Sequence, residues 1–443
     1  MKIITKIFVY LSIFFIPFYF LRFSIAGVLP TNVFEVAVAI TFLAILIISI
    51  VKRKKFILGS PIPYLLIISV AAAVMLSDSL RDGLGIFKGW FLIPLMLYIS
   101  IINVFTCHSE EGASDNRRIS VGFFALGDPR AQNDRSGKSS IEIAKISIPL
   151  YFNLLLISAW AVLQRLGVIG TLFYQNNDPS FNQYLSEHFR VFGPFESPNY
   201  LAMFLLPTAL LSIAIFQYVE IRWLKVLLAL TYLLPLAALF LSGSRGGVIA
   251  LILAVLLYLF ISKKDKFLDS AIISTGLAIV VFIAFAIAAY KFGFNPASDS
   301  ARIEIYKYSW QMIKANWAFG VGLGDFYNEI SSINPMAESF RTHALPYALH
   351  PHNIFMAFWL NAGLVGIFTF LLTVGNFFWQ MFKNQSKNLI WGGAFMAMVA
   401  ILTHGLFDST YWKNDLSAIF WLVLAVGYIY SQSKKDVIGQ DKI

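Results

Sequence analysis

The stretch HPHNIFMAFWLNAGLVG, residues 350–366, decides how this sequence folds. It opens with two histidines and an asparagine and continues as part of an apolar run over residues 353–375. A helix needs about 20 apolar residues to cross about 30 Å of hydrocarbon at 1.5 Å per residue. The run meets this requirement, so the stretch is predicted to begin a transmembrane helix with two histidines at its N-terminal end.

The rest of the chain shares this apolar character. Of its 443 residues, 58% are hydrophobic and 13% are charged, against about half and about a quarter in soluble domains. The apolar runs are far too long for barrel strands, so the fold class is an all-α polytopic membrane protein. About twelve transmembrane helices are predicted, each with an error of several residues at its ends. They cover residues 5–27, 33–51, 61–77, 86–105, 146–164, 199–217, 222–241, 247–262, 268–290, 353–375, 389–406 and 415–431.

The formal net charge of +10 is explained by topology rather than by nucleic-acid binding. Basic residues gather in five short loops or ends that fall on one side when the helices are counted: Lys2 and Lys6; Lys52, Arg53, Lys54 and Lys55; Lys263, Lys264 and Lys266; Lys383 and Lys387; Lys434 and Lys435. Short loops rich in Lys and Arg stay in the cytoplasm. Both termini are therefore predicted to be cytoplasmic.

The chain is predicted to be one integral membrane domain over residues 1–443. Residues 106–142 form a cytoplasmic loop, and residues 291–352 form the largest outer loop and lead into the opening stretch. The text SGKSS in the cytoplasmic loop lacks the first glycine of a phosphate-binding loop, because that position holds Gln132. The single cysteine, Cys107, excludes an internal disulfide and a CxxC metal site.

Two arginines stand on the outer face, where the charge rule predicts few cations. Arg245 lies in LSGSRGG, residues 241–247, whose glycines let the backbone approach a ligand closely at the start of a helix. A helix N-terminus and an arginine together make an anion site. Arg302 lies near the start of an amphipathic segment predicted to lie on the membrane face. The alternatives are a snorkelling arginine in a tight turn and a surface arginine.

The histidines of the opening stretch are two residues apart and can meet in a turn. Imidazole titrates near neutrality and can take a proton from a hydroxyl, although a histidine at a helix mouth can also be a plain interfacial residue. The sequence lacks HExxH and has no cysteine or paired carboxylate nearby, so no metal is predicted. Two more polar stretches close outer loops: VFGPFESPNYLAMF (191–204), preceded by Arg190, and THGLFDSTYWKND (403–415). Five polar features on one membrane face predict a shared outward-facing site.

This set of motifs resembles the O-antigen ligase and polymerase family. The resemblance rests on SGSRGG at a helix start, an arginine followed by NWAFGVGLGDF, HPHN leading into NAGLVG, and the earlier RVFGPFESPN. It covers roughly residues 190–410, with the motifs in the family's order and on one side of the membrane. One position departs from the pattern, because this chain has Asn361 where the family often has an acidic residue.

The resemblance implies a GT-C-like membrane glycosyltransferase of the bacterial inner membrane with its active site facing the periplasm. Such an enzyme moves a glycan from polyprenyl (undecaprenyl) diphosphate to a hydroxyl of the lipid A core oligosaccharide, without a metal or other cofactor. The implied catalytic residues are His352 as the base with Arg245 and Arg302 on the diphosphate; the expected substrate-binding residues are Arg190, Asn199, Ser244, His350 and Asn353. The alternatives are a polymerase that joins lipid-linked repeat units and a transporter of lipid-linked sugars, which should carry charges near the helix midplanes.

Overall fold

The computed structural model describes residues 2–25, 29–106, 142–170, 190–217, 219–262, 296–333, 350–385 and 388–440. Within these ranges the chain is helical except for turns and one antiparallel hairpin of β1 (Arg22–Ile25) and β2 (Leu29–Asn32). Eight helical stretches there are long and apolar enough to cross a membrane, and three further apolar helices are shorter. A polytopic, mainly helical membrane protein is therefore confirmed. The count of about twelve and the GT-C-like class stay predictions, and the predicted helix 268–290 lies outside the described residues.

The N-terminal part follows the predicted order with one correction. Its helices are α1 (Lys2–Phe14), η1 (Ile16–Phe18), α2 (Val33–Val51), α3 (Ile62–Val74), α4 (Leu80–Phe87), the π-helical segment η2 (Lys88–Leu92) and α5 (Ile93–Thr106). The predicted helix 5–27 is wrong over residues 15–25, where Pro17 falls in a short 3₁₀ turn and the chain enters the hairpin. Proline has no N–H and its ring clashes with the preceding helical turn, so the helix ends before it.

The C-terminal part holds the remaining helices. These are α7 (Ser147–Arg165), α9 (Pro198–Ser212), η4 (Ile213–Gln217), α10 (Arg222–Thr231), α11 (Leu233–Ser242), α12 (Arg245–Ser262), α14 (Pro296–Ala315), α15 (Phe326–Ile333), α17 (Ile354–Lys383), α18 (Leu389–His404) and α19 (Asn414–Gln440). The predicted span 222–241 corresponds to Arg222–Ser242, one of the eight stretches long and apolar enough to cross a membrane, although its helix is divided at Tyr232 into α10 and α11. Pro235 explains the break, because its ring clashes with the carbonyl four residues earlier.

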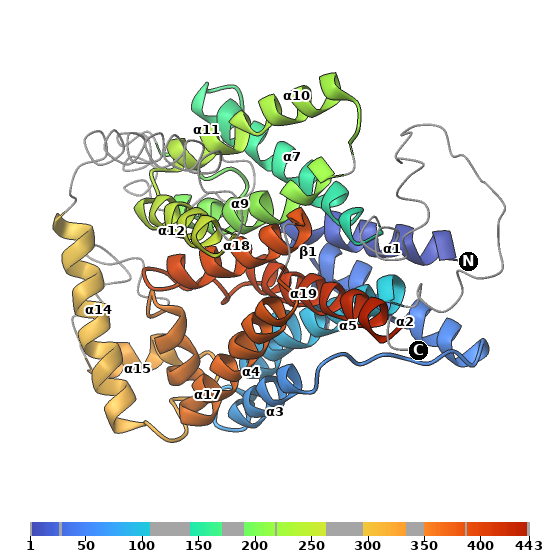
Figure 1. The fold of residues 1–443 in the computed structure, drawn as a ribbon. Coiled ribbons are helices and arrows are strands. Elements are labelled where there is room, and N and C mark those ends of the chain that lie inside the picture. The colour runs from blue at the N-terminus through green and yellow to red at the C-terminus, as the bar shows by residue number, and fades with distance from the viewer. Residues whose placement is uncertain are drawn as a thin grey trace.

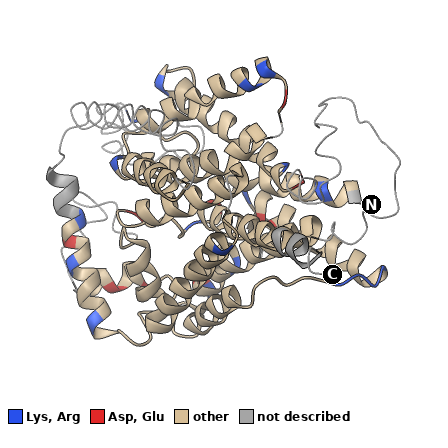
Figure 2. Cartoon of the chain, in the orientation of Figure 1, with Lys and Arg blue, Asp and Glu red and all other residues tan. Residues whose placement is uncertain are grey.

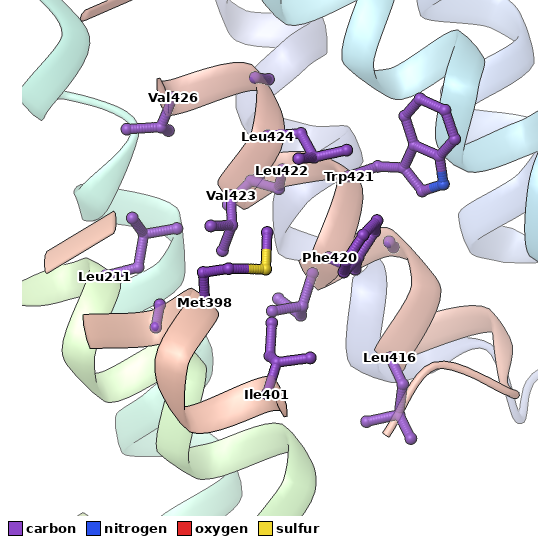
Figure 3. Close-up of a cluster of buried hydrophobic side chains, with 14 of the residues drawn as sticks. Leu211, Met398, Ile401, Leu416, Phe420, Trp421, Leu422, Val423, Leu424 and Val426 are labelled. Atoms are coloured by element: carbon purple, nitrogen blue, oxygen red, sulfur yellow. The ribbon is translucent and has the colours of Figure 1, made fainter. Parts of the chain in front are cut away.

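The core of the bundle lies around α19. Apolar side chains of α9, α18 and α19, among them Leu211, Met398 and Phe420, interlock there (Figure 3). The apolar stretch of α19 is 89% buried, whereas that of α12 is only 17% buried and exposes Leu253 and Phe260. In water such a surface would be an aggregation hazard, but in a bilayer it faces lipid. The peripheral helices are therefore the lipid-facing wall of the bundle.

Helix α14 marks one end of the molecule. It lies across the end of the bundle instead of running along it, while the start of α1 and the end of α19 lie at the opposite end (Figure 1). Figure 2 shows that α14 carries several charged residues, whereas the central helices are almost free of them. The polar motifs predicted for the outer face approach α14, whose Tyr306 hydroxyl bonds to the carbonyls of His352 and Leu406.

Candidate active site

The centre of the site is a histidine–carboxylate pair. His352 lies just before α17, and its Nδ1 lies 3.0 Å from Oδ1 of Asp408 in the turn between α18 and α19. Both side chains are more than 90% buried. Burial alone would raise the pKa of Asp408, but His352, Arg302 and His350 outweigh it and hold the pKa of this carboxyl well below its usual range. Asp408 is therefore a carboxylate, and the Nδ1–H of His352 donates to it.

His352 sits on a strained backbone. Its φ of +47° lies in the left-handed region, which a residue with a side chain seldom adopts. The next residue, Asn353, is extended and caps α17, with its side-chain oxygen accepting the N–H groups of Phe355 and Met356. The carbonyl of His352 accepts from the hydroxyl of Tyr306 on α14 at 3.0 Å. Such strain, of order 1–3 kcal/mol, persists where neighbouring contacts impose it, and it concentrates at active sites.

Asp408 also joins the start of α9 to the site. Its Oδ2 accepts from Nδ2 of Asn199 at 3.0 Å, and Oδ1 of Asn199 accepts from Arg190 at 3.0 Å. Arg190 in turn donates to the carbonyl of Ser242 at the end of α11. Two predicted binding residues, Asn199 and Arg190, are thus engaged in holding the carboxylate that orients His352.

Arg302 on α14 reaches the same carboxylate, with its guanidinium nitrogen 3.9 Å from Oδ2 of Asp408 and its side chain 26% exposed. A glycine loop, residues 320–324, fixes α14 against α17. There the N–H of Val321 donates to the carbonyl of Leu360 at 2.7 Å, and a Cβ at Gly320 would come within 2.3 Å of that oxygen. Only glycine permits this approach, so the loop is a helix stop and turn, as predicted.

Helix α17 is broken where this loop docks. Ala362 and Gly363 have non-helical backbone angles, and the N–H of Leu364 bonds back to the carbonyl of Trp317. The side chain of Asn361 accepts from the N–H of Gly324 at 2.8 Å and donates to a carbonyl of its own helix. An amide satisfies both partners, whereas an acidic side chain could only accept. This gives a structural reason for asparagine at the position that departs from the family pattern.

The SGSRGG segment, residues 242–247, forms a second part of the site, at the start of α12. Ser244 caps α12, because its hydroxyl accepts the N–H of Gly247, and it lies 3.4 Å from Nε2 of the buried His404. A Cβ at Gly246 would come within 2.8 Å of the His404 ring. Glycine at 246 therefore lets His404 pack against the start of α12. Arg245 is the first residue of this helix and is half-buried.

Two further predicted binding residues are engaged inside the protein. His350 bonds through Nε2 to the hydroxyl of Tyr200 at 2.7 Å, and its ring lies 4.5 Å from that of His352. Burial, followed by the charge of His352, lowers the pKa of His350 to about 3, so this imidazole is neutral. Asn353 is used in capping α17 and bonds to the carbonyl of Leu406.

One group of side chains has the composition of a metal site. His350, His352 and Asp408 each offer one ligand atom, and these atoms lie within 4.8 Å of one another. Two imidazoles and a carboxylate suit zinc or ferrous iron at about 2.0–2.2 Å. Here, however, Nδ1 of His352 and Oδ1 of Asp408 already satisfy each other at hydrogen-bond distance, 3.0 Å. The expectation of a metal-free site stays a prediction that a chelator tests.

No role was predicted from the sequence for Asp408, His404, Tyr200 or Lys413. Asp408, His404 and Lys413 lie in the polar stretch at 403–415, and Tyr200 lies in the one at 191–204; both stretches were singled out only for their predicted position on the outer face. A carboxylate and a histidine four residues apart at a helix end were a usable signal for Asp408. Tyr200 and Lys413 carry no such signal, because they act through contacts with distant parts of the chain.

Comparison with known proteins supports the resemblance. Residues 230–371 match the family described as O-antigen ligase. This segment carries Arg245, Arg302 and His352 but ends before Asp408. The chain is also similar to the teichuronic acid biosynthesis protein TuaE of Bacillus subtilis (strain 168), with 23% identity over 264 residues, which is 54% of this chain. The match spans about half of the relative, 52% of its length. The family resemblance is confirmed over the matched segment, residues 230–371.

Proposed function

We propose that this protein, which carries an O-antigen ligase segment over residues 230–371, is a glycosyltransferase of the bacterial inner membrane. It moves a glycan from undecaprenyl diphosphate to a hydroxyl of the lipid A core oligosaccharide on the periplasmic face. The observation that carries the proposal is the His352–Asp408 pair with Arg302 beside it, at the end of the bundle where α14 lies.

His352 is the general base in this proposal. With its Nδ1–H given to the ionised Asp408, the ring keeps the tautomer in which Nε2 is basic. Nε2 takes the proton of the acceptor hydroxyl, and the carboxylate stabilises the imidazolium that forms. A positioned base of this kind contributes about 10²–10⁴-fold to the rate.

The arginines bind the donor diphosphate. Arg302 is partly exposed beside the base, and Arg245 opens α12, whose first N–H groups and dipole favour an anion. Charge-assisted bonds contribute about 1.5–3 kcal/mol each and strengthen as the leaving group gains charge. The hydroxyl oxygen forms a bond to the anomeric carbon, and the bond from that carbon to the diphosphate oxygen breaks. The diphosphate leaves with the electron pair, and His352 keeps the proton.

A cavity below the site supports a lipid-linked donor. It measures about 340 Å³ and is lined by apolar side chains of α9, α11, α12 and α18, including Leu206, Leu239, Leu251 and Met396. The outer ends of the same four helices carry Asn199, the Ser242 carbonyl, Arg245 and His404, respectively. The cavity lies along the same four helices as these polar groups, so an isoprenoid chain bound there would run along the helices whose ends carry the proposed diphosphate site.

A polymerase is the second candidate, and the comparison favours it in one respect. The similar protein of Bacillus subtilis is named for teichuronic acid biosynthesis, which concerns a polysaccharide rather than lipid A. A polymerase would use the same donor, base and arginines. It differs in its acceptor, a hydroxyl of a second lipid-linked glycan.

The test uses the purified full chain in lipid nanodiscs with a glycan on undecaprenyl diphosphate. Lipid A core and a second lipid-linked glycan are offered as acceptors in separate reactions, and the product identifies a ligase or a polymerase. His352→Ala should lower turnover by about 10²–10⁴-fold. Glu304→Gln, an exposed change on α14, is the matched control. Parental turnover in the His352 variant would remove it from the mechanism.

The arginines are tested in the same assay. Arg245→Ala and Arg302→Ala should each weaken donor use severely, and Lys should rescue only in part, because it lacks the planar bidentate fork. Both arginines act on one group, so the double variant should be little worse than the poorer single variant. An Ala variant with parental turnover and donor affinity would make that arginine a topology or packing residue.

A further inference from the structure

The rings of His350 and Tyr200 extend away from the imidazole of His352, and the proposed reaction gives them no role. The ring of His350 meets the ring of His352 edge-on, with centroids 4.5 Å apart. Nε2 of His350 lies 2.7 Å from the hydroxyl of Tyr200. Over the face of Tyr200 stands Nζ of Lys413, 3.9 Å from the ring centroid, and Lys413 pairs with Glu196 at 3.0 Å. The rings form one continuous chain of contacts from a buried cation to the imidazole of the base.

We infer that His350 is a positioning residue for His352 and that the Tyr200 hydroxyl holds it in place. The inference rests on the proposed function, because it assigns His350 to the orientation of the base. It replaces the expectation from sequence that His350 binds substrate.

The first turn of α9 shows why Tyr200 suits this task. Asn199 and Tyr200 are consecutive residues there, and the N–H of Tyr200 is held by the capping hydroxyl of Ser197 at 3.3 Å. Asn199 bonds to Asp408, and Tyr200 bonds to His350. Two neighbouring residues of one helical turn therefore hold two groups that contact the imidazole of His352, Asp408 and His350.

The imidazole of His352 needs support on more than one side. Its backbone is in the left-handed region, and Asp408 holds its Nδ1. Packing against the face of the ring limits rotation about that hydrogen bond. A shift of about 1 Å at a reacting atom can cost about 10²-fold in rate. The His350 ring provides this packing and limits the rotation.

The neutral state of His350 matters during the reaction. Its pKa of about 3, set by burial and then by the charge of His352, leaves it uncharged when His352 becomes an imidazolium. A charged neighbour at 4.5 Å would oppose that step. Lys413, which is 6% exposed, lies over the face of the Tyr200 ring and helps to hold it, since a cation binds an aromatic face most strongly when shielded from water.

The experiment measures kcat and the donor KM for variants in nanodiscs. Tyr200→Phe should lower kcat about tenfold and leave the KM within twofold, because the base is misplaced while the diphosphate site is intact. His350→Ala should lower kcat by about 10–100-fold. His350→Gln should stay within about threefold of the parent, because its terminal amide reaches the Tyr200 hydroxyl. Tyr64→Phe, which loses a hydroxyl bond of 2.6 Å to the carbonyl of Leu58, is the control and should match the parent.

The combined variants separate positioning from loss of packing. In the Tyr200→Phe background, His350→Gln and His350→Ala should have the same kcat, because the glutamine amide needs the Tyr200 hydroxyl as its hydrogen-bond partner and phenylalanine lacks it. Parental kcat in Tyr200→Phe, or additive effects of the two changes, would overturn the inference.

A second readout does not depend on transfer. Diethyl pyrocarbonate modifies accessible neutral imidazoles, and peptide mass spectrometry follows each histidine separately. His350 should react slowly in the parent and at least fivefold faster in Tyr200→Phe, whereas equal rates would overturn the inference. If the parent shows no transfer, the proposed function fails, and the modification rates still decide whether Tyr200 holds His350.

Discussion

Replacing Asp408 by asparagine tests the centre of the proposed mechanism with a change of almost no volume. In the parent, Oδ1 accepts from Nδ1 of His352 and from the N–H of Ser409, while Oδ2 accepts from Asn199 at 3.0 Å. An asparagine offers one oxygen and one NH₂ group to these donors. If NH₂ faces His352, the ring must carry its proton on Nε2 and can no longer act as a base. If NH₂ faces Asn199, two donors oppose each other, because Oδ1 of Asn199 already accepts from Arg190.

The expected fall in kcat of Asp408→Asn has two causes, the loss of a charge-assisted hydrogen bond and the loss of the correct His352 tautomer. A charge-assisted hydrogen bond contributes about 1.5–3 kcal/mol, or about 10–10²-fold when it stabilises the imidazolium as it forms. Loss of the correct tautomer has cost about 10⁴-fold in a comparable histidine–aspartate pair. We therefore expect Asp408→Asn to lower kcat by between about 10²- and 10⁴-fold, with a smaller change in the donor KM.

The assay is the initial rate of glycan transfer by protein in nanodiscs, at matched protein levels. Glu304→Gln controls for the loss of one carboxylate near the outer face, since this residue is exposed on α14. Thermal melts of both variants establish that they are folded. If Asp408→Asn keeps more than about a third of the parental kcat, Asp408 does not orient the base, and the pair is only structural.

Three further outcomes are expected. Gly246→Ala should disturb the start of α12 and weaken donor binding, because its methyl would come within 2.8 Å of the His404 ring; an unchanged donor KM would argue against this contact. Burial lowers the pKa of His350 from 6.5 to about 3, so the unfolded chain gains a proton between these values and the native state does not. Lowering the pH from 7 to 5 should therefore reduce the unfolding free energy by up to about 2 kcal/mol in the parent and by less in His350→Gln, as measured by thermal melts. EDTA should leave transfer unchanged; loss of activity that a divalent ion restores would show that His350, His352 and Asp408 bind a metal.

The sequence alone located several of the helices that are long and apolar enough to cross a membrane. The predicted spans 33–51 and 146–164 correspond to α2 (Val33–Val51) and α7 (Ser147–Arg165). Local apolar runs determine these helices, because each backbone polar group in hydrocarbon must be satisfied within its own segment. Where proline interrupts a run, as at Pro17, length alone overestimates the helix. At Pro235 the proline breaks the helix, but the span as a whole, Arg222–Ser242, has the predicted length.

The motifs also named residues that the structure brings together at the candidate site. Arg302 and His352 were named from the sequence, and the structure brings both to Asp408. Arg245 was named as well, at the start of its helix. These residues stand in short polar stretches beside apolar runs, where topology gives no other reason for them.

Only the tertiary structure supplied the partners of these residues. Asp408 lies 56 positions from His352 and 209 from Asn199, and Tyr200 lies 150 positions from His350. Whether two such side chains meet depends on how α9, α17 and the turn before α19 pack, and no periodicity or local propensity records that packing. The chain therefore determines by itself which segments enter the membrane and which polar residues stand at its surface. The packing of those segments decides which carboxylate holds the histidine, and at what distance.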